Sequence, residues 1–248
     1  MKKIGLVGGM TPESTTAYYR MIIDLGRQRW NDPVHNPVVL IYSIDLAEIV
    51  AHQDVGDSDR VVEILAEVLE RLRAAGAEVG ALTANTPHLF FERIQSRTSL
   101  PLIHIVDATV ARARDLGVTR ALVLGTSATM EGTMYPSALS AAGIETVLPA
   151  DDERHFINRS IYEDLAAGSV TCELREAYLE ICRRQIEDRG VDGVILACTE
   201  IPLVLTVDAL PVPLVDTARC HAEAIFDAAL DDDQRSESSP DPLSSSST

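Results

Sequence analysis

Cys198 is the residue of this sequence best suited to proton-transfer chemistry. It follows the short apolar run of residues 194–197, which is typical of a buried strand in a parallel sheet. Thr199 and Glu200 come directly after it. Open α/β sheets place their ligands at the carboxyl ends of such strands. A cysteine there can exchange protons as thiol and thiolate, or it can pack as a small apolar side chain, and this segment alone leaves both interpretations open.

Residues 80–88 have the same organisation as the segment around Cys198. A short apolar run is followed by small and polar residues and then by Pro87. Asn85 and Thr86 take the place that Thr199 and Glu200 take in the later segment. Two further strand-like runs, ending at Gly8 and Gly125, match at a similar separation. The chain is therefore predicted to contain two similar halves.

Strands and helices must alternate to position these residues. Helical patterns are clearest at residues 57–75, 174–189 and 217–230, and they lie between runs typical of strands. The strand signals are residues 4–7, 38–42, 79–83, 102–105, 121–124, 146–148, 194–197 and 212–215. This alternation predicts an α/β fold of two similar parallel-sheet half-domains with helices on both faces. The active site is expected in the cleft between them.

The two half-domains are expected to meet near residue 105. Residues 1–105 together with 210–230 form the first, because the C-terminal strand and helix are expected to return to it. Residues 106–209 form the second. Residues 231–248 are acidic and rich in serine, with little to bury, so they are predicted to be disordered.

Composition excludes several classes of function. The chain has 248 residues, of which 46% are hydrophobic, and these suffice for real cores. Its net charge of −17 argues against nucleic-acid and membrane partners. It shows neither a membrane-length apolar run nor a signal peptide, so a cytoplasmic location is expected. The spacings of Cys172, Cys182, Cys198 and Cys220 match neither a disulfide framework nor a zinc site.

A glycine-rich turn follows the first predicted strand. Gly8 and Gly9 let the backbone approach a ligand, and the helix expected after Thr11 and Pro12 offers its N-terminal amides to an anion. The spacing of a nucleotide-binding motif is missing, so a carboxylate is the expected anion. A tight turn without a ligand is the alternative.

Taken together, these segments resemble the aspartate/glutamate racemase family, in its amino-acid racemase branch. The resemblance extends from Ile4 to about Ala228. The matching blocks are residues 8–15 with 18–20, 43–49 with Gln53, 85–88, 102–109, 124–126 with 129–131 and Tyr135, 152–154 with 157–158, 198–201, and 216–218 with 221–222.

The resemblance implies a homodimeric enzyme that racemises amino acids without a cofactor. Two cysteines of the family face each other across the substrate; one removes the α-proton as thiolate and the other protonates the opposite face. Cys198 matches the second of these cysteines. Four further matches imply donors to the substrate carboxylate, and three imply residues that shape the pocket. The donors are Asn85, Thr86, Thr126 and Thr199, and the pocket residues are Met10, Thr11 and Gln53.

The sequence departs from the family at the first cysteine, where Ala84 stands. Alanine has no proton to give. Thr83 can replace the thiol only if the strand has already ended, because neighbours on a strand point to opposite faces. An aliphatic hydroxyl also needs an activating neighbour. His88 is interpreted as a supporting or structural residue, so the group that serves this face remains open.

The segment after Cys198 is expected to tune the thiol. A helix start beside Cys198 predicts a lowered thiol pKa and makes this cysteine the one most readily alkylated. Glu200 has two interpretations: it orients or repels charge near Cys198, or it is an acid favoured at a helix N-terminus.

The expected function is that of a cofactor-independent amino-acid racemase or epimerase, acting on aspartate or glutamate. The only lysines are Lys2 and Lys3, so no Schiff-base lysine is available in the core for pyridoxal phosphate. No metal spacing is present either. Ala84 favours a first alternative, a one-cysteine decarboxylase or cis–trans isomerase on the same fold. A second alternative is a non-catalytic carboxylate-binding protein.

Overall fold

The computed structural model describes residues 1–206 and 208–230. The predicted disordered segment, residues 231–248, lies outside the described residues.

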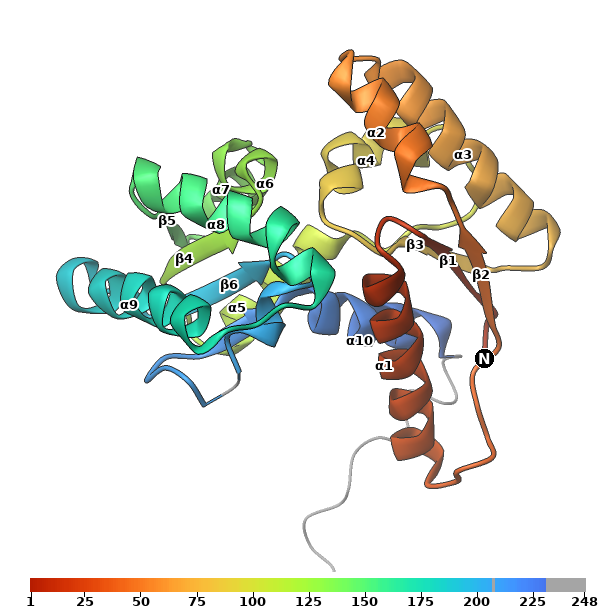
Figure 1. The fold of residues 1–248 in the computed structure, drawn as a ribbon. Coiled ribbons are helices and arrows are strands. Elements are labelled where there is room, and N and C mark those ends of the chain that lie inside the picture. Colours follow the sequence, from red (N-terminus) through yellow and green to blue (C-terminus); the bar gives the residue numbers. More distant parts are fainter. Residues whose placement is uncertain (207, 231–248) are drawn as a thin grey trace, which may run out of the picture.

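Two parallel sheets with the same strand order form the framework (Figure 1). The first sheet has the order β2–β1–β3, with strands β2 (Val39–Ser43), β1 (Ile4–Gly8) and β3 (Val79–Leu82). The second has the order β5–β4–β6–β7, with strands β5 (Glu145–Val147), β4 (Arg120–Gly125), β6 (Gly193–Ala197) and β7 (Leu214–Asp216). Strands β1 and β4 correspond, as do β3 and β6, so the predicted fold of two similar parallel-sheet halves is confirmed.

Helices cover both faces of each sheet (Figure 1). We call the part built on the first sheet the first half and the part built on the second sheet the second half. The helices of the first half are α1 (Pro12–Trp30), α2 (Leu46–Asp54), α3 (Ser58–Ala74), the short 3-10 helix η1 (Thr86–Phe90) and α4 (Phe91–Gln95). Those that follow are α5 (Ile105–Asp115), α6 (Ser127–Glu131), α7 (Met134–Ala141), α8 (Asp151–Glu163), η2 (Leu165–Ala167), α9 (Cys172–Arg189), η3 (Ile201–Leu203) and α10 (Thr217–Ala229).

Alternating side chains of the central strands fill separate cores on the two faces of each sheet. Leu122 and Leu124 of β4 pack with residues of α8 and α9, whereas Ala121 and Val123 pack with residues of α5 and α7. Burial of both faces explains why these strands read as continuous apolar runs in the sequence. No helix within the described residues is long and apolar enough to cross a membrane.

The C-terminal segment does not return to the first half as a unit. Strand β7 pairs with β6 and extends the second sheet, so the expected placement of this strand with the first half is wrong. Helix α10 packs against α1, β1 and β3 of the first half and also against α5, β6 and β7. Its apolar side chains therefore join the two halves, and Figure 1 shows it lying between them.

The strand expected at residues 102–105 is reduced to a single bridge. Leu102 pairs with Gly80 at the edge of β3, and Ile105 already begins α5. Pro101 cannot donate a backbone hydrogen bond, which limits how far this edge can extend. The segment thus links the halves instead of adding a strand.

The turn between β1 and α1 brings the N-terminus of α1 to the sheet edge. Gly9 has a φ of 84°, and a methyl group there would overlap the backbone of Ile44. The Gly9 N–H donates to the Thr15 hydroxyl over 2.8 Å, and the Thr11 hydroxyl caps α1 by accepting from the Ser14 N–H. This arrangement fixes Met10 and Thr11 at the carboxyl end of β1.

The close approach at Gly9 gives a stability prediction. Gly9→Ala and Gly117→Ala both place a side chain at positive φ, which costs roughly 1–2 kcal/mol. Only Gly9 has backbone atoms in the way, because nothing lies within 4 Å of a Cβ at Gly117. We expect Gly9→Ala to lose roughly 1–3 kcal/mol more than Gly117→Ala in urea unfolding. Equal losses would show that the turn relaxes freely.

Candidate active site

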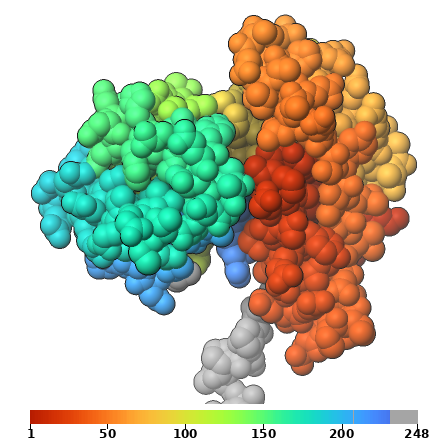
Figure 2. All heavy atoms as spheres, in the orientation of Figure 1, coloured from red at the N-terminus to blue at the C-terminus, as the bar shows by residue number. Residues whose placement is uncertain are grey.

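A pocket of about 220 Å³ lies between the two halves, at the carboxyl ends of β1, β3, β4 and β6. Figure 2 shows the halves as two lobes that meet along a crease. The pocket is lined by every predicted site residue except Thr83. These lining residues are Met10, Thr11, Gln53, Ala84, Asn85, Thr86, Thr126, Cys198, Thr199 and Glu200. Residues 114 or more positions apart in the chain, such as Asn85 and Thr199, therefore meet here because equivalent strands end at one cleft.

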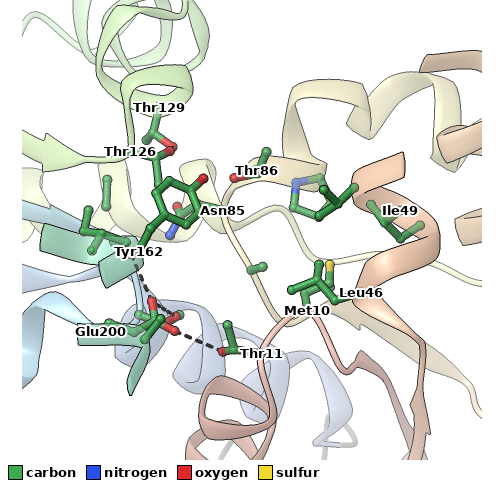
Figure 3. A pocket seen from close by; sticks show the side chains of 18 of the residues that line it. Met10, Thr11, Leu46, Ile49, Asn85, Thr86, Thr126, Thr129, Tyr162 and Glu200 are labelled. Carbon is green, nitrogen blue, oxygen red and sulfur yellow. Dashed lines mark hydrogen bonds between the residues drawn. The ribbon is translucent and has the colours of Figure 1, made fainter. Parts of the chain in front are cut away.

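Glu200 is the centre of the polar side of this pocket (Figure 3). One carboxylate oxygen accepts a hydrogen bond from the Thr11 hydroxyl over 3.0 Å, across the cleft. The other accepts from the Cys198 thiol over 2.9 Å and from the Thr199 hydroxyl over 2.7 Å. The side chain is only 6% exposed. Glu200 thus reaches the N-cap of α1 through the Thr11 hydroxyl, and of its two interpretations the structure favours the action on Cys198.

The Cys198 thiol has a higher pKa than the sequence suggests. Burial, followed by the charge of Glu200 and the hydrogen bond to it, raises the pKa of Cys198 well above its ordinary value. Its hydrogen bonds from the backbone amides of Glu200 and Thr199 act in the opposite direction but are weaker. The expected lowering of the pKa is therefore wrong, because burial and then the carboxylate two residues away outweigh the neighbouring helix start.

The remaining cysteines differ from one another in exposure. Cys172 is exposed at the start of α9, whereas Cys182 and Cys220 are buried, which raises the pKa of each to about 12. Cys172, not Cys198, is thus the accessible thiol. Burial of Cys198 and exposure of Cys172 argue against the expectation that Cys198 is the one most readily alkylated, which iodoacetamide labelling would test.

Thr83 lies outside the pocket. Its side chain is fully buried, and its hydroxyl donates to the Val7 carbonyl over 3.0 Å. Its own carbonyl accepts from the Ser14 hydroxyl. Thr83 therefore joins β3 to β1 and to α1, and Ala84, the next residue, takes the position that faces the cleft.

Asn85 uses most of its amide group to hold the two halves together. Its Oδ1 accepts from the Tyr135 hydroxyl over 2.6 Å, and its Nδ2 donates to the Thr217 hydroxyl over 3.2 Å. Thr217 in turn donates to the Leu196 carbonyl in β6. One amide hydrogen of Asn85 remains for a ligand. Thr86, Thr126 and Thr129 carry further hydroxyl groups on this side of the pocket.

His88 also lies outside the pocket lining and supports Ala84 from behind. Its Nδ1 is 2.8 Å from the Ala84 carbonyl oxygen, and its ring stacks on Phe91. Burial, with a contribution from His221, lowers the pKa of His88 well below its ordinary value. A neutral imidazole therefore fixes the backbone at the end of β3.

Several lining residues carry no signal that identifies them before the fold is known. Leu46, Ile49 and Val50 of α2 face the pocket, and their i, i+3, i+4 spacing reads as an ordinary core stripe. Tyr162, near the end of α8, reaches into the pocket mouth with 65% of its surface exposed. Burial, and then Cys198 and Glu200, raise the pKa of Tyr162, so its phenol is neutral and lies on the side of the thiol.

The described part of the pocket lining carries one charged side chain, which is a carboxylate. Among the described residues that line the pocket, none is lysine, arginine or histidine, and Glu200 is the one carboxylate. No group of three or more His, Cys, Asp or Glu side chains in residues 1–206 and 208–230 could hold a metal ion.

A family model matches most of the chain. The model of the Asp/Glu/hydantoin racemase family matches residues 7–225. The chain belongs to the Asp/Glu/hydantoin racemase family. The matched residues include the ends of β3 and β6, which face the cleft.

Relatives described as racemases or racemase homologues are similar to this chain over nearly its whole length. A putative Asp/Glu racemase structure from Yersinia pestis is 38% identical, with a TM-score of 0.86 over 93% of this chain and 100% of its own. The structure of an aspartate racemase homologue from Pyrococcus horikoshii is 36% identical, with a TM-score of 0.83 over 92% of this chain and 99% of its own. The broad specificity amino-acid racemase RacX from Bacillus subtilis is 26% identical over 92% of this chain and 98% of its own.

The Glu200–Cys198 contact predicts how the thiol titrates in this racemase-family chain. Glu200→Gln removes the charge that disfavours the thiolate, so the pKa of Cys198 should fall. We expect the midpoint of Cys198 alkylation by iodoacetamide, followed by mass spectrometry in a Cys172→Ser background, to move to lower pH.

A matched control removes the same charge elsewhere. Glu187 is exposed on α9, and Glu187→Gln should leave the alkylation midpoint of Cys198 in place. An unchanged midpoint in Glu200→Gln would mean that Glu200 does not hold the thiol in solution.

Proposed function

We propose that this chain exchanges the α-proton of an amino acid through Cys198, without a cofactor, as a racemase or epimerase. The observation that carries the proposal is the Cys198–Glu200 hydrogen bond of 2.9 Å at one side of the pocket. The hydrogen bond holds the sulfur beside the pocket, and once the thiol has lost its proton the thiolate can accept the α-proton of a bound substrate.

The negative charge that develops on the substrate needs hydrogen-bond donors. Removal of the α-proton moves charge onto the substrate carboxylate, which becomes enolate-like. Thr86, one hydroxyl of the hydrogen-bonded Thr126–Thr129 pair and the remaining amide hydrogen of Asn85 supply donors in the pocket lining. Such donors, fixed before the reaction, stabilise charge most where water is excluded. These residues keep the carboxylate-binding role that the resemblance implies.

The two sides of the pocket are chemically unequal. Cys198, Glu200 and Tyr162 are the ionisable residues of the described lining, and all three belong to the second half. The side at the end of β3 has the methyl group of Ala84. A single thiol can remove and return a proton on one face, whereas inversion needs a donor on the other. Exchange should therefore be faster than inversion.

An acidic substrate is not part of this proposal. A side-chain carboxylate of aspartate or glutamate would find no cation to pair with, because the described lining supplies none. The amino acid itself, as the family membership implies, remains the substrate. The homodimer implied by the resemblance remains a prediction, which sedimentation analysis would test.

Ala84 also favours a second candidate function, a one-cysteine decarboxylase. Loss of carbon dioxide from a malonate-type acid leaves the same kind of carbanion, and a single thiol suffices to protonate it. Release of carbon dioxide from an α-substituted malonate, with no exchange on any amino acid, would decide for this candidate.

The unequal faces give a kinetic prediction. In D₂O, we expect one enantiomer of a substrate to lose its α-proton signal in proton NMR before its antipode accumulates. A positioned donor contributes roughly 10²–10⁴-fold, so Ala84→Cys, which adds a thiol on the empty side, should speed inversion more than exchange. Cys198→Ala should lose both reactions.

Two controls bracket this experiment. Ala84→Ser adds volume and a hydroxyl without a comparable acid, so it should raise inversion far less than Ala84→Cys. If the wild-type chain inverts as fast as it exchanges, and Ala84→Cys changes nothing, the one-sided mechanism is wrong.

The raised pKa of Cys198 sets the direction of the pH dependence. The thiol predominates at neutral pH. As long as the pH is below the pKa of Cys198, the thiolate fraction therefore grows about tenfold for each unit by which the pH increases. The exchange rate should rise steadily from pH 7 to pH 9. A rate that is flat over this range would contradict thiolate as the base.

A further inference from the structure

We propose that the pocket selects amino acids with an uncharged, apolar side chain, which lies against α2 and Met10. This inference rests on the proposed function, because it assigns the substrate class of that same site. It replaces the expectation of an acidic substrate.

One wall of the pocket is mainly apolar, and Gln53 of α2 is a polar side chain beside it. Met10, Leu46, Ile49 and Val50 all come from the first half and line the pocket together. Met10 is 7% exposed and Ile49 is 3% exposed, so both are fixed in the core of that half. Figure 3 shows Met10, Leu46 and Ile49 gathered on the side opposite Glu200 and Thr126. A substrate with its carboxylate among the threonines would therefore direct its side chain at this wall.

A charged side chain finds no oppositely charged partner at this wall, where the amide of Gln53 is neutral. A carboxylate there would lose water without gaining a cation, since no described lining residue is basic. An ammonium or guanidinium group would meet the same apolar atoms. The one carboxylate, Glu200, lies on the opposite side and already accepts three hydrogen bonds, from Thr11, Cys198 and Thr199.

The size of the pocket agrees with a single amino acid. Its volume of about 220 Å³ is below the range of roughly 300–1,000 Å³ that is usual for drug-sized ligands.

Leucine and aspartate provide the sharpest comparison, because each carries two heavy atoms on Cγ. Their shapes match while their side-chain charges differ. We would titrate each into Cys198→Ala by calorimetry, so that binding is measured without turnover, and follow their α-proton exchange with the wild-type chain in D₂O. One methylene in an apolar pocket is worth roughly 10- to 200-fold, so leucine should bind at least about tenfold more tightly than aspartate.

Val50→Arg tests the wall itself. Val50 is 40% exposed at the pocket, so a longer side chain can be accommodated there without entering the core. The added cation should shift the leucine-to-aspartate affinity ratio toward aspartate by at least about tenfold. Val50→Met is the matched control, because it lengthens the side chain without charge and should keep the preference for leucine.

The outcomes separate the two proposals. Tighter binding of aspartate, no binding of either amino acid, or a ratio unchanged by Val50→Arg overturns the inference about the side chain. Preferential binding of leucine with exchange lost in Cys198→Ala supports both proposals. Preferential binding of leucine without exchange of any amino acid supports the inference and overturns the proposed proton transfer.

Discussion

The site depends on one buried carboxylate that has hydrogen-bond donors around it but no cation. Glu200 accepts from Thr11 in the first half and from Cys198 and Thr199 in the second. A buried carboxylate without a cation is tolerated only where donors satisfy its oxygens. Three such donors converge here, so the same group links the halves and sets the protonation of the thiol. The N-cap of α1 and the chemistry of Cys198 are therefore parts of one polar network.

The two halves are held together by contacts of two kinds. On the pocket side the contacts are polar: Thr11 with Glu200, and Asn85 with Tyr135 and Thr217. Beyond Thr217, α10 packs apolar residues against α1 and α5. Hydrogen bonds of neutral groups contribute roughly 0.5–1.5 kcal/mol each, and those to charged groups roughly 1.5–3 kcal/mol. The polar contacts fix the geometry of the pocket, while α10 provides the apolar surface common to both halves.

The sequence predicts most of the fold and the position of the site, because both depend on local signals. Short apolar runs end in polar residues at Cys198 and at Asn85, and parallel strands bring such ends to one edge. The predictions from the sequence that are wrong concern features that tertiary contacts decide. β7 joins the second sheet because β6 offers it an open edge, and residues 102–105 stop at one bridge. The pKa of Cys198 was predicted in the wrong direction because burial and the rotamer of Glu200 cannot be read from spacing.

The duplicated fold is symmetric, whereas its chemistry is not. Ala84 follows β3 as Cys198 follows β6, so the two residues occupy equivalent places in the two halves. The surroundings differ as much as the residues do. A neutral His88 holds the carbonyl of Ala84, and the side chain of Asn85 is occupied by Tyr135 and Thr217, whereas Cys198 has a carboxylate within hydrogen-bond distance. The end of β3 therefore serves as a rigid, uncharged support, and the end of β6 carries the proton.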